Sequence, residues 1–154
     1  MSIKKVVAAQ YKKIVDRLQA LPLEVKIPPE GWLCTIRKAL GMSRVQLANK
    51  LKVTRAQVFK FEKEELKGSV TIKSMHRVAE AMGCYFVYAI IPPKGVDDLI
   101  KEQAKRKARH IVSKANIQMA LEEQLLANDK IQFEIDRLTQ QIWHEMPSDL
   151  WNEE

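Results

Sequence analysis

The sequence predicts a mainly α-helical fold with one β-strand. Hydrophobic residues make up 46% of the 154 residues, which is enough for a core. Aromatic residues make up only 6%, and there are only 5 glycines and 6 prolines, which argues against a β-sandwich or barrel. Apolar residues recur at steps of three and four along most of the chain, which indicates amphipathic helices.

Residues 1–30 are predicted to form one helix followed by a linker. Apolar residues spaced as one helix face occur at Ile3, Val7, Tyr11, Ile14, Leu18 and Leu21. Pro22 ends this pattern. The linker contains Pro28 and Pro29, which a helix interior does not tolerate.

Residues 31–83 are predicted to form a domain of five short helices. The first helix ends at Gly41. Ser43 and Gln46 then have the spacing of a capping box at the start of the second helix, and Thr54 can cap the third. After the turn at Gly68, the pattern predicts a short helix and, as its continuation, a fifth helix.

Residues 84–93 are predicted to contain a β-strand that joins two copies of the chain. The segment CYFVYAII is aromatic and β-branched and ends at Pro92. A lone strand leaves its backbone groups unpaired, and the chain offers no second strand. Antiparallel pairing across a two-fold axis solves this, so we expect a homodimer. The pairing residues would be Tyr85, Phe86, Val87, Tyr88, Ala89 and Ile90.

Residues 94–154 are predicted to be helical, with a break near Asn128 and an acidic tail. Residues 1–95 carry 18 basic and 7 acidic residues, a net charge of +11, whereas residues 116–154 carry 2 and 9, a net charge of −7. The basic charge of residues 1–95 favours a polyanionic partner. The acidic tail, residues 116–154, favours a different partner. Between them lies a basic run that either flanks such a polyanion or is a solvated face: Lys101, Lys105, Arg106, Lys107, Arg109 and Lys114.

Several classes of protein are excluded by the sequence. The N-terminus lacks the apolar core of a signal peptide, and the longest apolar run is far shorter than the ~20 residues of a membrane span. We therefore expect a cytoplasmic protein with free thiols at Cys34 and Cys84. No phosphate-binding glycine loop and no HExxH zinc motif occurs, so we expect no enzyme, no cofactor and no metal site.

Residues 40–65 have the anatomy of a helix-turn-helix: two capped helices joined by a tight turn. The second helix would enter the major groove of double-stranded DNA, with its N-terminal residues at the base edges. The predicted base contacts are Arg55, Ala56, Gln57 and Lys60. The predicted phosphate contacts are Ser43, Arg44, Lys50, Lys52 and Thr54. Phe59 either touches a thymine methyl or sugar, or packs in the loop after Glu62.

Residues 31–82 resemble the Cro/repressor-type (XRE-like) helix-turn-helix family, which has a lambda-repressor-like helical core. The resemblance implies that Arg44 replaces a phosphate-binding glutamine. It also implies a structural ion pair between Arg37 and Glu62. The glycine after the recognition helix comes late in this chain, at Gly68, so a longer loop than in the family is expected there.

Nearly the whole chain resembles the small family called mobile mystery protein A. The similar segments are GWLCTIRKALGMS, YAIIPP, Gln103-Ala104, MALEEQ and Leu150-Trp151. The resemblance implies a bacterial protein that accompanies a Fic-domain protein in a toxin–antitoxin-like pair. The [S/T]xxxE[G/N] motif of known Fic inhibitors does not occur, so inhibition would be steric or indirect.

The sequence therefore predicts an autoregulating repressor, nucleoid-associated when bound, with the recognition helix at residues 54–62. The alternative is a protein-binding antitoxin whose C-terminal helices hold a Fic partner, with DNA binding secondary. An RNA-binding helical module is a third reading. Partner contacts would involve Trp143, Leu150 and Trp151, unless Leu150 and Trp151 pack on the chain's own helices.

Overall fold

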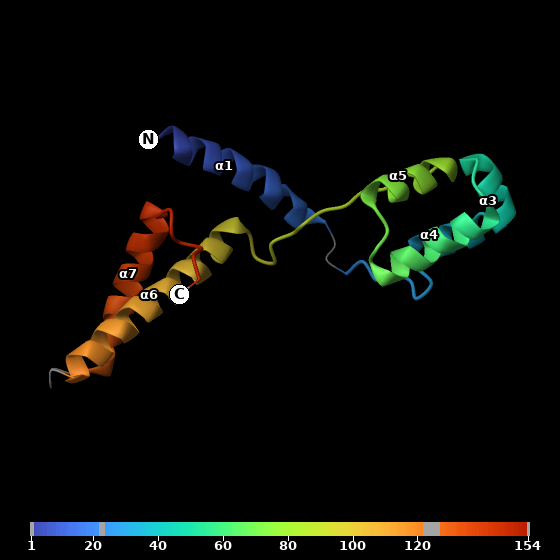
Figure 1. Cartoon of the computed structure of the whole chain (residues 1–154). Coiled ribbons are helices and arrows are strands. Elements are labelled where there is room, and N and C mark those ends of the chain that lie inside the picture. The colour runs from blue at the N-terminus through green and yellow to red at the C-terminus, as the bar shows by residue number, and fades with distance from the viewer. Residues whose placement is uncertain (1, 22–23, 122–126, 154) are drawn as a thin grey trace. The chain divides into compact units, whose positions relative to one another are not determined.

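The computed structural model is built from helices and their connections (Figure 1). It describes residues 2–21, 24–121 and 127–153, and within these it has seven α-helices, one 3-10 helix and no strand. The predicted mainly-α class is confirmed. The chain divides into a central unit, Pro22–Ala89, and a terminal unit that combines Met1–Leu21 with Ile90–Glu154.

The central unit contains four helices around one core. They are α2 (Trp32–Ala39), α3 (Arg44–Leu51), α4 (Arg55–Lys67) and α5 (Ile72–Ala81). The buried core consists of Leu33, Leu47, Ala48, Leu51, Val58, Phe61, Met75, Val78 and Met82. Five helices were predicted after residue 31, but the last two form one helix, α5, because no glycine or proline interrupts the chain between Thr71 and Met82.

Both predicted N-caps around the turn between α3 and α4 are confirmed. Ser43 Oγ accepts a hydrogen bond from the Gln46 backbone N–H at 3.1 Å, and Gln46 Oε1 accepts one from the Ser43 N–H at 2.8 Å. Thr54 Oγ1 accepts from the Gln57 N–H at 3.1 Å. Between them, Lys52 ends α3 in the left-handed conformation (φ 56°), which reverses the chain so that α4 begins at Arg55.

The loop predicted after Glu62 is wrong, because α4 continues to Lys67 and ends at Gly68 in the left-handed conformation. The longer helix carries Glu65 to the start of α2. There the Glu65 carboxylate accepts from the Trp32 N–H at 2.6 Å and from the Leu33 N–H at 3.0 Å. Two otherwise unpaired donors of α2 are thus satisfied from a different helix.

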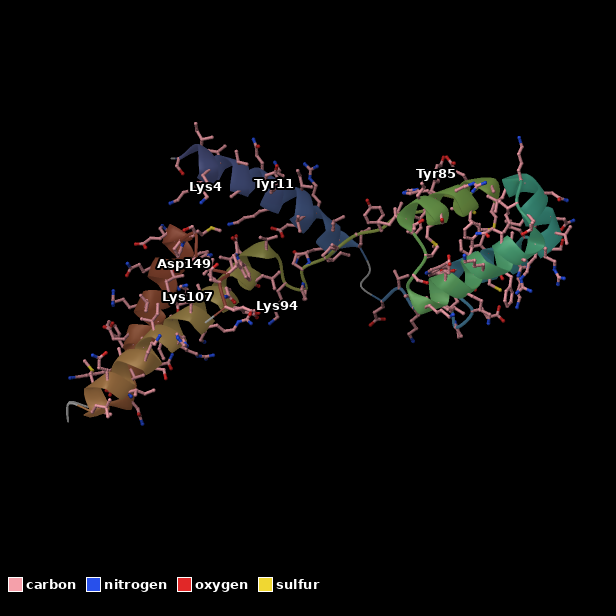
Figure 2. All side chains as sticks on the ribbon, in the orientation of Figure 1. Lys4, Tyr11, Tyr85, Lys94, Lys107 and Asp149 are labelled. Atoms are coloured by element: carbon pink, nitrogen blue, oxygen red, sulfur yellow. The ribbon has the colours of Figure 1, made fainter. Side chains whose placement is uncertain are left out.

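Residues 84–93, predicted as a strand, form an irregular segment in the single chain. Phe86 packs on the central core, and its ring lies 5.1 Å from that of His76. By contrast, Tyr85, labelled in Figure 2, is 97% exposed, and Ile90 is 90% exposed. A strand needs a partner for its backbone groups, so pairing across a dimer stays a prediction.

The terminal unit pairs α6 (Val96–Leu121) with α7 (Asn128–Glu145), which lie side by side in Figure 1. Their shared core consists of Ile100, Ala104, Ala108, Val112, Ile135, Ile142 and Leu150. The predicted break lies where α7 begins. The N-terminal helix α1 (Ile3–Asp16), followed by a 3-10 turn (Arg17–Ala20), joins α6 because Asp16 Oδ1 accepts from the Val96 N–H at 3.0 Å.

The C-terminal turn corrects the prediction that Leu150 is a partner contact, since Leu150 is only 1% exposed. After Met146, which is left-handed, the chain folds back so that Gln103 Nε2 donates to the Leu150 carbonyl at 2.9 Å. Lys107 Nζ also pairs with Asp149 Oδ2 at 3.1 Å (Figure 2). Leu150 therefore packs on the chain's own helices, while Trp151 is 59% exposed.

Candidate nucleic-acid interface

The first turns of α4 present the predicted base-contacting side chains. Arg55, Ala56 and Lys60 are exposed and Gln57 is half-buried. The residues of α4 that are buried are Val58, Phe61 and Glu62. Since a helix that buries one face presents the other, the arrangement leaves the N-terminal part of α4 free to enter a groove.

The predicted phosphate-contacting residues lie at the two ends of α3 and at the start of α4. Ser43, Lys50, Lys52 and Thr54 are exposed, whereas Arg44 is half-buried. The Ser43 and Thr54 hydroxyl oxygens accept the capping hydrogen bonds described above. These residues therefore lie at the start of α3 and around the turn into α4, and their contact with phosphates stays a prediction.

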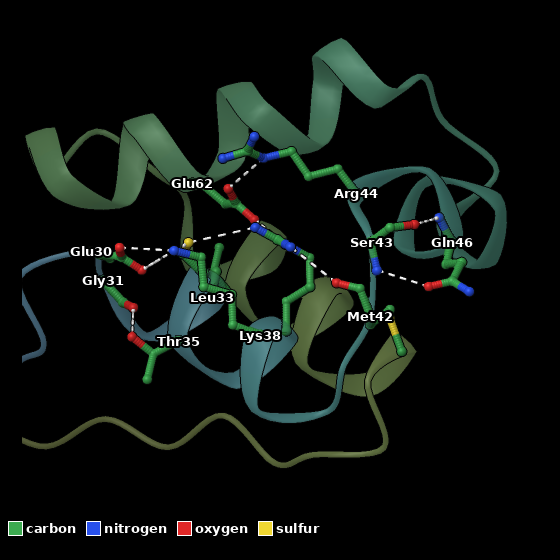
Figure 3. Close-up of polar contacts among 12 residues, drawn as sticks. Glu30, Gly31, Leu33, Thr35, Lys38, Met42, Ser43, Arg44, Gln46 and Glu62 are labelled. Carbon is green, nitrogen blue, oxygen red and sulfur yellow. Dashed lines mark hydrogen bonds and ion pairs between the residues drawn. The ribbon is translucent and has the colours of Figure 1, made fainter.

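A buried ion pair joins α2 to α4 (Figure 3). Arg37 Nε donates to Glu62 Oε1 at 2.6 Å, and the two side chains are 7% and 6% exposed. Arg37 Nη1 also donates to the Met42 carbonyl at 3.0 Å. The hydrogen bond to Glu62 raises the pKa of the Arg37 guanidinium, so Arg37 remains charged inside the fold.

Glu62 also holds Arg44, which the sequence did not indicate. Arg44 Nε donates to Glu62 Oε2 at 2.9 Å (Figure 3). The guanidinium carbon of Arg44 lies 5.0 Å from the centre of the Phe59 ring, and Lys63 Nζ lies 5.3 Å from it. Phe59 is thus a cation-binding surface, 45% exposed, rather than a residue packed in a loop.

Cys34 lies beside this network. Its thiol donates to Glu30 Oε2 at 3.5 Å and accepts from Arg37 Nη2 at 3.5 Å. Burial, together with the negative charge of Glu62, raises the pKa of the Cys34 thiol. Both cysteines of the described chain are free thiols, and only Cys34 is buried.

Comparison with known families identifies the class of this domain. A protein-family model described as helix-turn-helix matches residues 35–88. The matched part of the central unit is therefore similar to helix-turn-helix domains of the XRE type, which are DNA-binding regulatory domains. Comparisons with curated proteins and with solved structures gave no match. Among the described residues, no helix has the length and apolar character to cross a membrane.

Proposed function

We propose that the protein is an autoregulating repressor that binds an operator upstream of its own gene. One arrangement carries this proposal: a capped α3, a left-handed turn at Lys52 and an exposed start of α4. All three lie within the segment that matches a helix-turn-helix family model. Residues 22–89 carry 12 basic and 6 acidic residues, a net charge of +6, which suits a phosphate backbone.

Affinity and specificity have different sources in this proposal. The basic residues near the start and end of α3 supply phosphate contacts, which act on any duplex and weaken with salt. Arg55, the first residue of α4, can donate two hydrogen bonds to the O6 and N7 atoms of one guanine. Arg55 therefore carries sequence preference, and Lys52 carries general affinity.

Arg55→Ala is expected to weaken binding to the upstream DNA by about 5- to 150-fold, since a bidentate base contact contributes about 1–3 kcal/mol of discrimination. The matched variant Lys52→Gln should weaken binding to upstream and random duplexes by the same factor. It should also lower the salt slope by about 0.9, the value for one phosphate contact. Fluorescence anisotropy of labelled duplexes across a salt series measures both the affinity and its salt slope. Equal losses on both duplexes for Arg55→Ala would contradict the assignment of α4.

The proposed repressor is a homodimer joined through residues 84–93. An antiparallel pair of these segments would set two copies of α4 on half-sites one DNA turn apart, ~34 Å. It would also place the exposed side chains of Tyr85 and Val87 on one face of the ribbon, beside those of the partner strand.

Val87→Pro is expected to convert the dimer to a monomer, because proline removes a ladder N–H and is not accommodated inside a paired strand. Sedimentation at micromolar concentration measures the mass. Val87→Thr, which keeps the β-branched shape, is the control and should stay dimeric. A wild-type chain that sediments as a monomer would rule out the pairing.

A Fic-domain partner, implied by the resemblance, is the second candidate role, and the exposed Trp151 favours it. Trp151 follows a turn that Lys107 and Gln103 fix on α6, and its large apolar side chain is 59% exposed. Trp151→Ala is expected to abolish co-purification with a co-expressed Fic-domain protein while leaving DNA affinity unchanged. Unchanged co-purification would remove Trp151 from the partner surface.

A further inference from the structure

The side chain of Arg44 is fixed by other side chains, in contrast to the other basic residues that are predicted to contact phosphate. It is the first residue of α3, directly after the Ser43 cap, and its side chain is 31% exposed. Lys50 and Lys52 are exposed, and no contact of their ammonium groups occurs among the described residues. Arg44, in contrast, is fixed by two groups of α4.

The two groups hold the inner part of the guanidinium. Glu62 accepts from Nε at 2.9 Å, and the Phe59 ring lies 5.0 Å from the guanidinium carbon. Within the described part of the chain, these contacts leave the terminal Nη1 and Nη2 groups of Arg44 without a hydrogen bond. A guanidinium held in this way keeps two parallel donors available, and that is the geometry that binds a phosphate in a bidentate manner.

The carboxylate in turn is fixed from the core. Glu62 Oε1 accepts from Arg37, and Oε2 accepts from Arg44, so one buried side chain links α2, α3 and α4. The orientation of Arg44 thus depends on the packing of the recognition helix. Phe59 contributes the face of its ring, which attracts a cation without competing for the phosphate.

From this geometry we infer that Phe59 and Glu62 are positioning residues, which aim the Arg44 guanidinium at a DNA phosphate. The inference rests on the proposed DNA-binding function. Arginine loses rotamer freedom when it binds a phosphate, and a side chain already held by Glu62 and Phe59 loses less. Phe59 then increases affinity for every duplex through Arg44, without reading a base.

A double-mutant cycle on a short random-sequence duplex tests this inference with the whole chain. Arg44→Ala is expected to bind roughly tenfold more weakly, the effect of losing a charged hydrogen-bond donor. Phe59→Leu keeps every charge and should bind roughly threefold more weakly, since it removes the cation–π contact. In the Arg44→Ala background, Phe59→Leu should cause no further loss. Phe59→Tyr, which keeps the ring, should restore wild-type affinity.

Lys60→Gln provides the matched cycle, because Lys60 neighbours Phe59 on α4 but pairs with Glu64 at 3.7 Å. The losses of binding free energy caused by Lys60→Gln and by Phe59→Leu should add in the double variant. Additive losses from Arg44→Ala and Phe59→Leu would overturn the positioning role and place Phe59 in direct contact with DNA. Wild-type affinity in Phe59→Leu would also overturn it. A wild-type chain that binds no duplex would overturn the proposed function together with this inference.

Discussion

Replacing Arg37 with methionine is expected to lower the free energy of unfolding of the central unit by about 3–5 kcal/mol, the cost of removing one partner from a buried ion pair. The reason is that the Glu62 carboxylate, 5% exposed, loses its buried 2.6 Å partner and keeps only the half-buried Arg44 at 2.9 Å. The Met42 carbonyl loses its donor in the same change.

Chemical denaturation followed by Trp32 fluorescence measures this loss, with Trp143 and Trp151 replaced by phenylalanine so that only the central unit is observed. Lys38→Ala is the control, because it breaks an ion pair with Glu30 in which both side chains are 54% exposed. The denaturation midpoint of Lys38→Ala should equal that of wild type. Combining Arg37→Met with Glu62→Leu should recover most of the lost stability, since neither member of the buried Arg37–Glu62 pair then remains without the other. An unchanged midpoint for Arg37→Met would show that the pair contributes nothing to folding.

Leu150→Ala is expected to lower the free energy of unfolding of the terminal unit by about 2–5 kcal/mol, the range for truncating a buried leucine. Leu150 is 1% exposed and closes the core formed by α6 and α7. Its removal leaves a cavity, and it also weakens the attachment of the turn that carries Trp151.

Denaturation followed by Trp143 fluorescence, with Trp32 and Trp151 replaced by phenylalanine, measures the effect. Leu121→Ala is the control because Leu121, at the end of α6, is 83% exposed. If Leu150→Ala lowers the free energy of unfolding no more than Leu121→Ala does, the C-terminal turn does not pack on the core in solution.

The parts of the fold predicted from sequence are those that neighbouring residues determine. The Ser43–Gln46 capping box and the Thr54 cap each depend on residues three positions apart. The same is true of the apolar spacing that marks the helices. These local preferences were sufficient to place α3, the turn and α4, and therefore to name the exposed side chains at the start of α4.

The parts that were missed depend on residues far apart in the sequence. Glu65, on the extension of α4, caps the start of α2, 33 positions earlier, and an adjacent pair of glutamates gives no indication of that contact. Leu150 is buried because the turn after Met146 folds back onto α6, 47 positions from Gln103. The Arg44–Phe59 contact likewise requires the crossing of two helices, which no local pattern specifies.

The most direct test of the central claim is an NMR titration of the ¹⁵N-labelled chain with the upstream duplex. If α4 enters the major groove, the largest amide shift changes should fall at the start of α3, in the turn at Lys52, at the Thr54 cap, and on α4 as far as Lys60. Substituting random duplex should retain the changes near Arg44 and reduce those at Arg55. Changes confined to α6 and α7, or none with either duplex, would contradict the assignment of the DNA-binding surface.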